Sequence, residues 1–144
     1  MSRQHRRQFL KEAGFGMAAL TAFHVGTSAL RAASANERLQ VGIIGPGGMG
    51  SAHLNELVGR QDVLVSHVCD VDANRLAAAA QVVRDKTGRD AQAVKDLRQI
   101  LDDKSVDAVW IATPDHWHAP ATILACAAGK HVYVEKPCAH NIRE

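Results

Sequence analysis

The chain has 144 residues, of which 47% are hydrophobic and 22% are charged, a composition that suits one globular α/β domain with a real core. No purely apolar tract reaches the length of a membrane-spanning helix, so we expect no integral membrane span. Positive charge is concentrated in the first 35 residues, because beyond them twelve Lys and Arg residues stand against fourteen Asp and Glu residues. The net charge of +2 therefore gives no reason to expect a nucleic-acid partner.

Residues 1–35 have the order of an export signal rather than that of a fold element. The run Arg6-Arg7-Gln8-Phe9-Leu10-Lys11 resembles the twin-arginine export motif. An apolar region rich in Gly and Ala follows at 13–30, and the Ala-Ser-Ala at 33–35 is a small-x-small cleavage site. An amphipathic helix with arginines on its polar side is the alternative, but the glycines within the segment disfavour it. We therefore predict a cleaved signal peptide, a mature chain that begins at Asn36, and a periplasmic or otherwise exported protein.

A glycine-rich turn is the strongest local motif of the mature region. The apolar run 39–44 predicts a strand, and the pattern that continues to Val58 predicts a helix. Between them the sequence has the spacing G-x-G-x-x-G, which permits a tight turn, a close approach of the main chain to a pyrophosphate, and packing of helix on strand. The main-chain N–H groups and the positive end of the helix dipole would face the phosphates. The turn residues expected to bind a dinucleotide are Gly45, Gly47, Gly48, Met49 and Gly50.

An acidic residue follows at the distance that a dinucleotide site requires. The second apolar run, 63–69, ends at Asp70, which lies 20 residues past Gly50. A carboxylate there can accept hydrogen bonds from both hydroxyls of the adenosine ribose and would repel a 2′-phosphate. We therefore predict NAD as the cofactor, with NADP less favoured.

The rest of the mature region alternates helix and strand patterns. Asp72 is the expected N-cap of an alanine-rich helix, and Gly88 is its expected left-handed C-terminal residue. Further strands are expected at 90–93, 106–112 and 130–134, with helices at 95–101 and 119–128. Strands joined by helices without hairpin turns predict an α/β domain at 36–144, a Rossmann-like, doubly wound parallel sheet.

The three cysteines form no C-x-x-C pair. Cys69 ends an expected strand and Cys126 falls in the apolar pattern of a helix, so we expect both to pack in the interior. Cys138 is the third cysteine, and an odd number leaves at least one thiol unpaired. We therefore predict no disulfide framework.

Two segments with reactive side chains follow the fourth and fifth expected strands, at the sheet edge where open α/β sheets bind ligands. The first is Thr113-Pro114-Asp115-His116-Trp117-His118, and the second is Glu135-Lys136-Pro137-Cys138. With the glycine turn and Asp70, the A-T-P-x-x-x-H element and the E-K-P tripeptide resemble the Gfo/Idh/MocA family of glucose–fructose oxidoreductase, inositol dehydrogenase and rhizopine catabolism proteins. The resemblance covers residues 39–144, and D-H-W-H and C-A-H-N look like its exported, sugar-directed bacterial branch.

The resemblance implies roles for residues at these strand ends. Lys136 would be the catalytic residue, directed towards the nicotinamide and the substrate hydroxyl, and Glu135 would lie against the cofactor. A solvated lysine after an edge strand is the alternative for Lys136. Thr113 and Pro114 would hold the chain against the riboses. His116 and His118 would bind the cofactor further round.

A metal site is the other interpretation of the histidine pair, with Asp115 as a third ligand. No further cluster of His, Asp or Glu is evident in the sequence, so we predict no metal, and Trp117 between the histidines suits packing at a pocket wall. The family also carries a histidine at the position of His53, which we expect to be a helix residue packed on the sheet.

The family continues beyond a domain of this kind through a crossover helix, a final strand and a second α/β domain that supplies most sugar contacts. We therefore expect the chain to be the N-terminal part of a homo-oligomeric protein, and to be inactive alone. Three functions stay open. The protein could oxidise a sugar or cyclitol hydroxyl with NAD, it could be an NAD-dependent glycosidase of the same family, or it could be a non-catalytic nucleotide-binding remnant.

Overall fold

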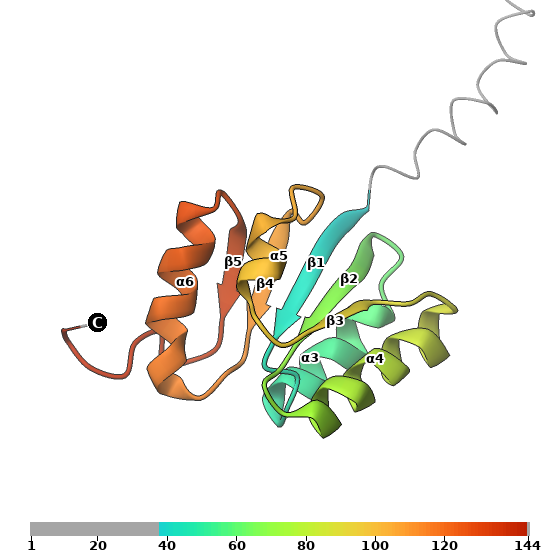
Figure 1. Cartoon of the computed structure of the whole chain (residues 1–144), viewed down its shortest axis with the longest axis horizontal. Coiled ribbons are helices and arrows are strands. Elements are labelled where there is room, and N and C mark those ends of the chain that lie inside the picture. The colour runs from blue at the N-terminus through green and yellow to red at the C-terminus, as the bar shows by residue number, and fades with distance from the viewer. Residues whose placement is uncertain (1–37, 144) are drawn as a thin grey trace, which may run out of the picture. The chain divides into compact units, whose positions relative to one another are not determined.

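The computed structural model describes residues 38–143, so the predicted signal peptide lies outside the described residues. Within this range, five parallel strands form one sheet in the order β3-β2-β1-β4-β5 (Figure 1). The strands are β1 (Leu39–Ile44), β2 (Val63–Cys69), β3 (Gln92–Val94), β4 (Ala108–Ile111) and β5 (His131–Val134). The helical elements are α3 (Met49–Val58), α4 (Ala73–Thr87), α5 (Arg98–Asp102), η2 (Asp115–Trp117) and α6 (His118–Ala127). The predicted parallel α/β sheet with Rossmann-like connections is confirmed.

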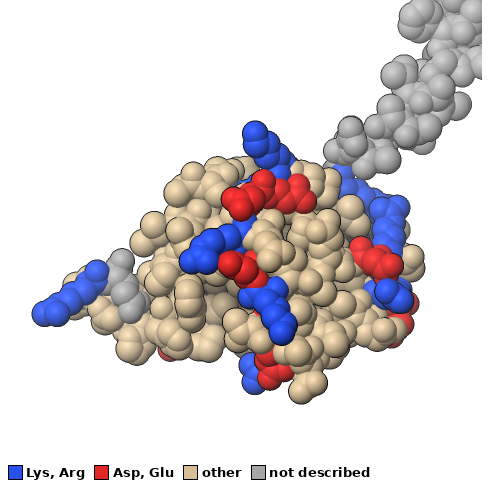
Figure 2. All heavy atoms as spheres, viewed as in Figure 1, with Lys and Arg blue, Asp and Glu red and all other residues tan. Residues whose placement is uncertain are grey.

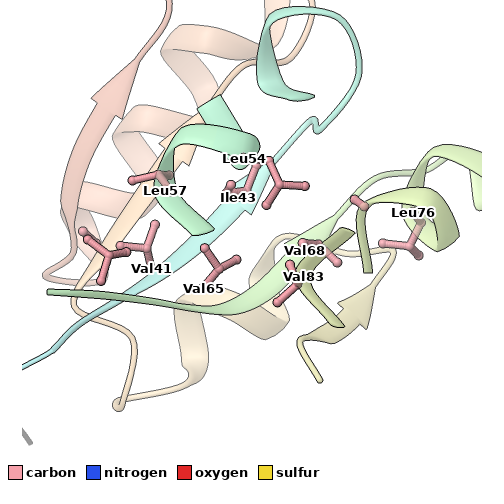
Figure 3. Close-up of a cluster of buried hydrophobic side chains, with 11 residues drawn as sticks. Val41, Ile43, Leu54, Leu57, Val65, Val68, Leu76 and Val83 are labelled. Atoms are coloured by element: carbon pink, nitrogen blue, oxygen red, sulfur yellow. The ribbon is translucent and has the colours of Figure 1, made fainter. Parts of the chain in front are cut away.

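Apolar side chains cover both faces of the sheet. Because successive residues of a strand point to opposite faces, Ile43 and Ile44 of β1 belong to different clusters. Ile43 packs among buried side chains of α3, α4 and β2, several of which are drawn in Figure 3. Ile44 packs with Ile100 of α5 and Ala121 of α6 on the other face. Because helices cover both faces of the sheet, the edge formed by the carboxyl ends of the strands is left open to a ligand.

The two predicted caps of α4 are confirmed. The Asp72 Oδ1 accepts hydrogen bonds from the main-chain N–H groups of Asn74, at 2.8 Å, and Arg75, at 3.1 Å. Gly88 has φ 66°, the left-handed conformation in which a residue without a Cβ is not strained. The helix therefore begins and ends where local sequence predicts.

Several element boundaries differ from the sequence prediction. The strand expected from Val106 begins at Ala108, because Lys130 Nζ donates to the carbonyl oxygens of Asp103, at 2.6 Å, and Val106, at 2.9 Å, and holds that segment as a turn. Lys130 itself precedes β5, since its main-chain N–H donates to Ala125 of α6. The helix expected at 95–101 is shorter, and η2 is an additional turn before α6.

The packing prediction for Cys69 is confirmed, and that for Cys126 is wrong. Cys69 is buried, and burial raises the pKa of its thiol to about 12, so it stays protonated and unreactive at neutral pH. Cys126 is exposed, because Ala121 and Ala125 take the inward positions of α6, four residues apart. Apolar residues lie on more than one side of this helix, so the sequence pattern alone does not identify the buried face.

On the face shown in Figure 2, Lys and Arg side chains lie beside Asp and Glu side chains in small mixed groups, with uncharged surface between the groups. None of the helices in the described range is long and apolar enough to cross a membrane.

His67 of β2 gives the fold a dependence on pH. Its side chain is 2% exposed, and burial lowers its pKa below the ordinary 6.5. The unfolded chain therefore binds more protons than the folded chain as the pH falls below about 6.5, and stability should decline there. We expect the urea midpoint to fall between pH 7.5 and pH 5.5, and to fall less in His67→Gln.

Exposed His131 supplies the control for this measurement. His131→Gln should keep the pH dependence of the unmodified chain. If the urea midpoint depended on pH equally in His67→Gln and His131→Gln, His67 would not be the source of the pH dependence.

Candidate functional site

A cavity of about 760 Å³ opens at the edge where the strands end. That volume suits a small ligand or cofactor. It is lined by every residue that the sequence predicts for the site except Gly50, which is buried beneath the turn. The lining predicted residues are Gly45, Gly47, Gly48, Met49, Asp70, Thr113, Pro114, His116, His118, Glu135 and Lys136. The structure thus brings the four separate segments together, and their contacts with a cofactor stay predictions.

Two glycines allow the turn between β1 and α3 to close tightly. Gly45 has φ 81°, and a Cβ there would lie 2.9 Å from the Ala112 carbonyl group after β4. A Cβ on Gly50 would lie 2.0 Å from the Gly45 carbonyl oxygen, which no side chain tolerates. The turn therefore needs glycine at both positions, and it presents the N-terminus of α3 to the cavity.

The part of the cavity beside Asp70 has charges of both signs. The Asp70 Oδ1 accepts a hydrogen bond from the Asp72 N–H at 2.9 Å, which orients this carboxylate at the end of β2. Arg75 and Lys95 line the same region. The Arg75 Nη1 lies 3.1 Å from the point where a Cβ would stand if Gly47 had a side chain. Neither cation was predicted from the sequence, because the approach of Arg75 to Gly47 depends on how α4 packs beside the turn.

His118 lies at the floor of the cavity rather than at its mouth. The side chain is 1% exposed. Its Nδ1 lies 2.6 Å from the Pro137 carbonyl oxygen, and its Nε2 lies 2.7 Å from the Thr113 carbonyl oxygen. Both ring nitrogens therefore contact main-chain acceptors. His116, on η2, is exposed at the cavity wall.

Glu135 is fixed by a histidine from α3. The Glu135 Oε1 lies 2.6 Å from the His53 Nε2, and this hydrogen bond holds the pKa of the carboxyl below its ordinary value. The His53 ring also contacts Tyr133 edge-on, with centroids 5.4 Å apart, and Tyr133 stacks on Trp110 at 4.4 Å. The packing of His53 on the sheet is confirmed, and its hydrogen bond to Glu135 was not predicted.

Lys136 is exposed at the rim of the cavity, directly after Glu135. Its main-chain N–H donates to the Glu135 Oε2 at 3.1 Å. The ammonium group can therefore reach a ligand in the cavity without losing a buried partner. Over residues 38–143, no three His, Cys, Asp or Glu side chains converge as metal ligands would.

A parallel sheet, a glycine turn at the first strand end and an acid at the second define a dinucleotide-binding domain. Residues 39–144 match the family described as "Oxidoreductase family, NAD-binding Rossmann fold", the Gfo/Idh/MocA family. The chain belongs to this family, and it is an NAD-binding domain of the oxidoreductase type.

Relatives and solved structures agree with this assignment. A "Glycosyl hydrolase family 109 protein" of Saccharopolyspora erythraea is 32% identical, with 92% of this chain and 32% of the relative covered. An "Alpha-N-acetylgalactosaminidase" of Shewanella oneidensis is 30% identical, with 97% and 35% covered. The myo-inositol dehydrogenase of Lactobacillus casei, solved with NAD(H) and myo-inositol, is 33% identical with a TM-score of 0.63, and 71% of this chain and 29% of that chain are covered. The chain thus spans about a third of the length of the curated relatives it matches.

The residues present fit NAD. The glycine turn suits a close main-chain approach, since the three atoms nearest to where a Cβ on Gly47 would lie belong to the Arg75 side chain, the first at 3.1 Å, and that side chain can move. Asp70 and Lys136 both line the cavity, one after β2 and the other after β5. The two ends of a dinucleotide would therefore have their predicted partners in one cavity.

Proposed function

We propose that the chain is the cofactor-binding part of an enzyme that transfers hydride between a sugar or cyclitol hydroxyl and NAD. The observation that carries the proposal is the position of Lys136 at the rim of the cavity that also contains Gly47 and Asp70. The solved relative with bound NAD(H) and myo-inositol supports a polyhydroxylated substrate. We further propose that the intact protein is a homo-oligomer, which light scattering would test.

Each residue has a defined task in this reaction. NAD, when bound, supplies the hydride acceptor. The turn at Gly47 and Gly48 would hold the pyrophosphate through main-chain N–H groups, and Asp70 would accept hydrogen bonds from the adenosine ribose. Lys136 would lie beside the substrate hydroxyl, where its ammonium group would stabilise the negative charge that develops on oxygen while the hydroxyl proton passes to solvent.

A glycosidase is the second candidate. It is favoured by the relatives described as glycosyl hydrolase family 109 proteins and by the relative described as an alpha-N-acetylgalactosaminidase. Such an enzyme oxidises a sugar carbon transiently, eliminates the leaving group, adds water to the unsaturated intermediate and returns the hydride to the product. The residues of this domain serve both reactions, because both begin with removal of a hydride.

The intact protein, incubated with NAD and a panel of cyclitols, sugars and aryl glycosides, separates the candidates. Net formation of NADH supports the dehydrogenase. Cleavage of a glycoside without net NADH supports the glycosidase. Binding of NAD without either reaction would leave a nucleotide-binding remnant and contradict the proposal.

Cofactor preference depends on Asp70. We expect the unmodified protein to bind NAD more tightly than NADP. Asp70→Ser should raise NADP affinity by roughly tenfold, because a repulsive charge is removed while the cations Arg75 and Lys95 remain in the cavity lining. Titration calorimetry with both nucleotides measures the change.

Asp72→Ser is the matched control, since it removes a nearby carboxylate outside the cavity lining and serine keeps the N-cap of α4. It should leave the preference unchanged. Tighter binding of NADP than of NAD by the unmodified protein would contradict the role of Asp70.

Export through the twin-arginine route is a separate proposal, based on Arg6-Arg7-Gln8-Phe9-Leu10-Lys11. Arg6→Lys together with Arg7→Lys should leave the precursor in the cytoplasm, because the route recognises the arginine pair. Cell fractionation measures the distribution, and N-terminal sequencing of the exported form should begin near Asn36. Export of the double variant at the normal level would identify another kind of signal.

A further inference from the structure

His118 connects two loops that are distant in sequence. Thr113 lies just after β4, and Pro137 directly follows Lys136 after β5. The two carbonyl oxygens of these residues lie 2.7 Å and 2.6 Å from the two nitrogens of one imidazole ring. His118 is the first residue of α6 and is 1% exposed, so this connection lies in the interior of the protein.

The chemistry of the two partners defines how the ring can hold them. A carbonyl oxygen only accepts hydrogen bonds, so a ring nitrogen that carries a proton donates to the carbonyl group it faces. Both carbonyl oxygens lie within hydrogen-bond distance of this one buried ring. Removal of the imidazole would therefore leave a gap between the two loops and a buried carbonyl oxygen without its donor.

The main chain on the other side of Lys136 is held as well. The Glu135 N–H donates to the Ile111 carbonyl oxygen at 2.9 Å, and its carboxylate lies between the His53 Nε2, at 2.6 Å, and the Lys136 N–H, at 3.1 Å. Residues before and after Lys136 are thus attached to different helices. The exposed Lys136 side chain is what remains free to meet a ligand.

We propose that His118 is a positioning residue, which sets the place of the Lys136 ammonium group by holding the Pro137 and Thr113 carbonyl groups in one bridge. The proposal rests on the function proposed above. It replaces a direct cofactor contact, because a ring nitrogen could bind a ribose hydroxyl only by giving up one of these carbonyl groups. The bridge joins the loop after β4, which contains Thr113, to the loop after β5, which contains Pro137.

Kinetics of the intact protein test the positioning. His118→Asn removes the bridge, and we expect kcat to fall by about 10²-fold, the scale for displacing a catalytic group by about 1 Å. The dissociation constant of NAD should be nearly unchanged, because Gly47 and Asp70 stay in place. His131→Asn, an exposed histidine outside this cavity, is the control and should leave kcat unchanged. A parallel loss of NAD affinity, or an unchanged kcat, would overturn the proposal.

Nuclear magnetic resonance of the full chain with ¹⁵N-labelled histidine tests the bridge without any need for activity or for a folded variant. We expect a ring N–H of His118 that exchanges slowly with water, because the ring is buried against two main-chain carbonyl oxygens. A ring whose protons exchange as fast as those of the exposed His131 would overturn the bridge. A slowly exchanging ring proton in a protein that shows no hydride transfer would instead contradict the proposed function and keep the bridge.

Discussion

Lys136→Ala should lower kcat of the intact protein by about 10²-fold or more, the usual scale for loss of an acid–base or electrostatic group. The ammonium group stabilises charge that develops only as hydride leaves, so its removal affects the transition state more than the bound ground state. The dissociation constant of NAD should change little, because the pyrophosphate is held at the Gly45–Gly50 turn. Steady-state kinetics and calorimetry measure the two effects separately.

Lys136→Arg distinguishes charge from geometry. The guanidinium group keeps the positive charge but is planar and wider than an ammonium group, so we expect this variant to be poor as well. A Lys136→Ala enzyme with near-normal kcat would make Lys136 a surface residue. The proton chemistry would then belong to other parts of the intact protein.

Sequence predicted the features that depend on neighbouring residues. The glycine turn, the N-cap at Asp72 and the left-handed Gly88 follow from local backbone requirements, and each forms as expected. The alternation of strand and helix also predicted the parallel sheet, because such connections have few alternatives. These features brought nearly all the predicted site residues to one cavity.

The interactions that the sequence left out join residues far apart in the chain. His53 and Glu135 are 82 residues apart, and His118 and Pro137 are 19 apart. Their pairing depends on strand order and on how far α3 and α6 extend, neither of which a local pattern contains. Arg75 was missed for the same reason, since its approach to Gly47 depends on the packing of α4 beside the turn. The misplaced Cys126 shows the complementary failure, in which an apolar helix pattern fits more than one face.

Two glycines of the turn should separate effects on folding from effects on binding. A Cβ at Gly47 would meet the flexible end of Arg75 at 3.1 Å, and that side chain can move. Gly47→Ala should therefore fold nearly as well as the unmodified protein. It should bind NAD about tenfold more weakly, since the added methyl group stands where the pyrophosphate approaches.

Gly50→Ala should instead destabilise the fold. Its Cβ would lie 2.0 Å from the Gly45 carbonyl oxygen and 3.2 Å from the Ala112 Cβ, and the first of these contacts is with main chain that cannot rotate away. Relief requires α3 to move from β1, at a cost of about 3 kcal/mol or more. For a domain of this size the melting temperature should fall by roughly 10 °C or more. Thermal unfolding followed by circular dichroism measures the melting temperature. Equal melting temperatures for Gly50→Ala and Gly47→Ala would contradict the close packing of Gly50 against the Gly45 carbonyl group.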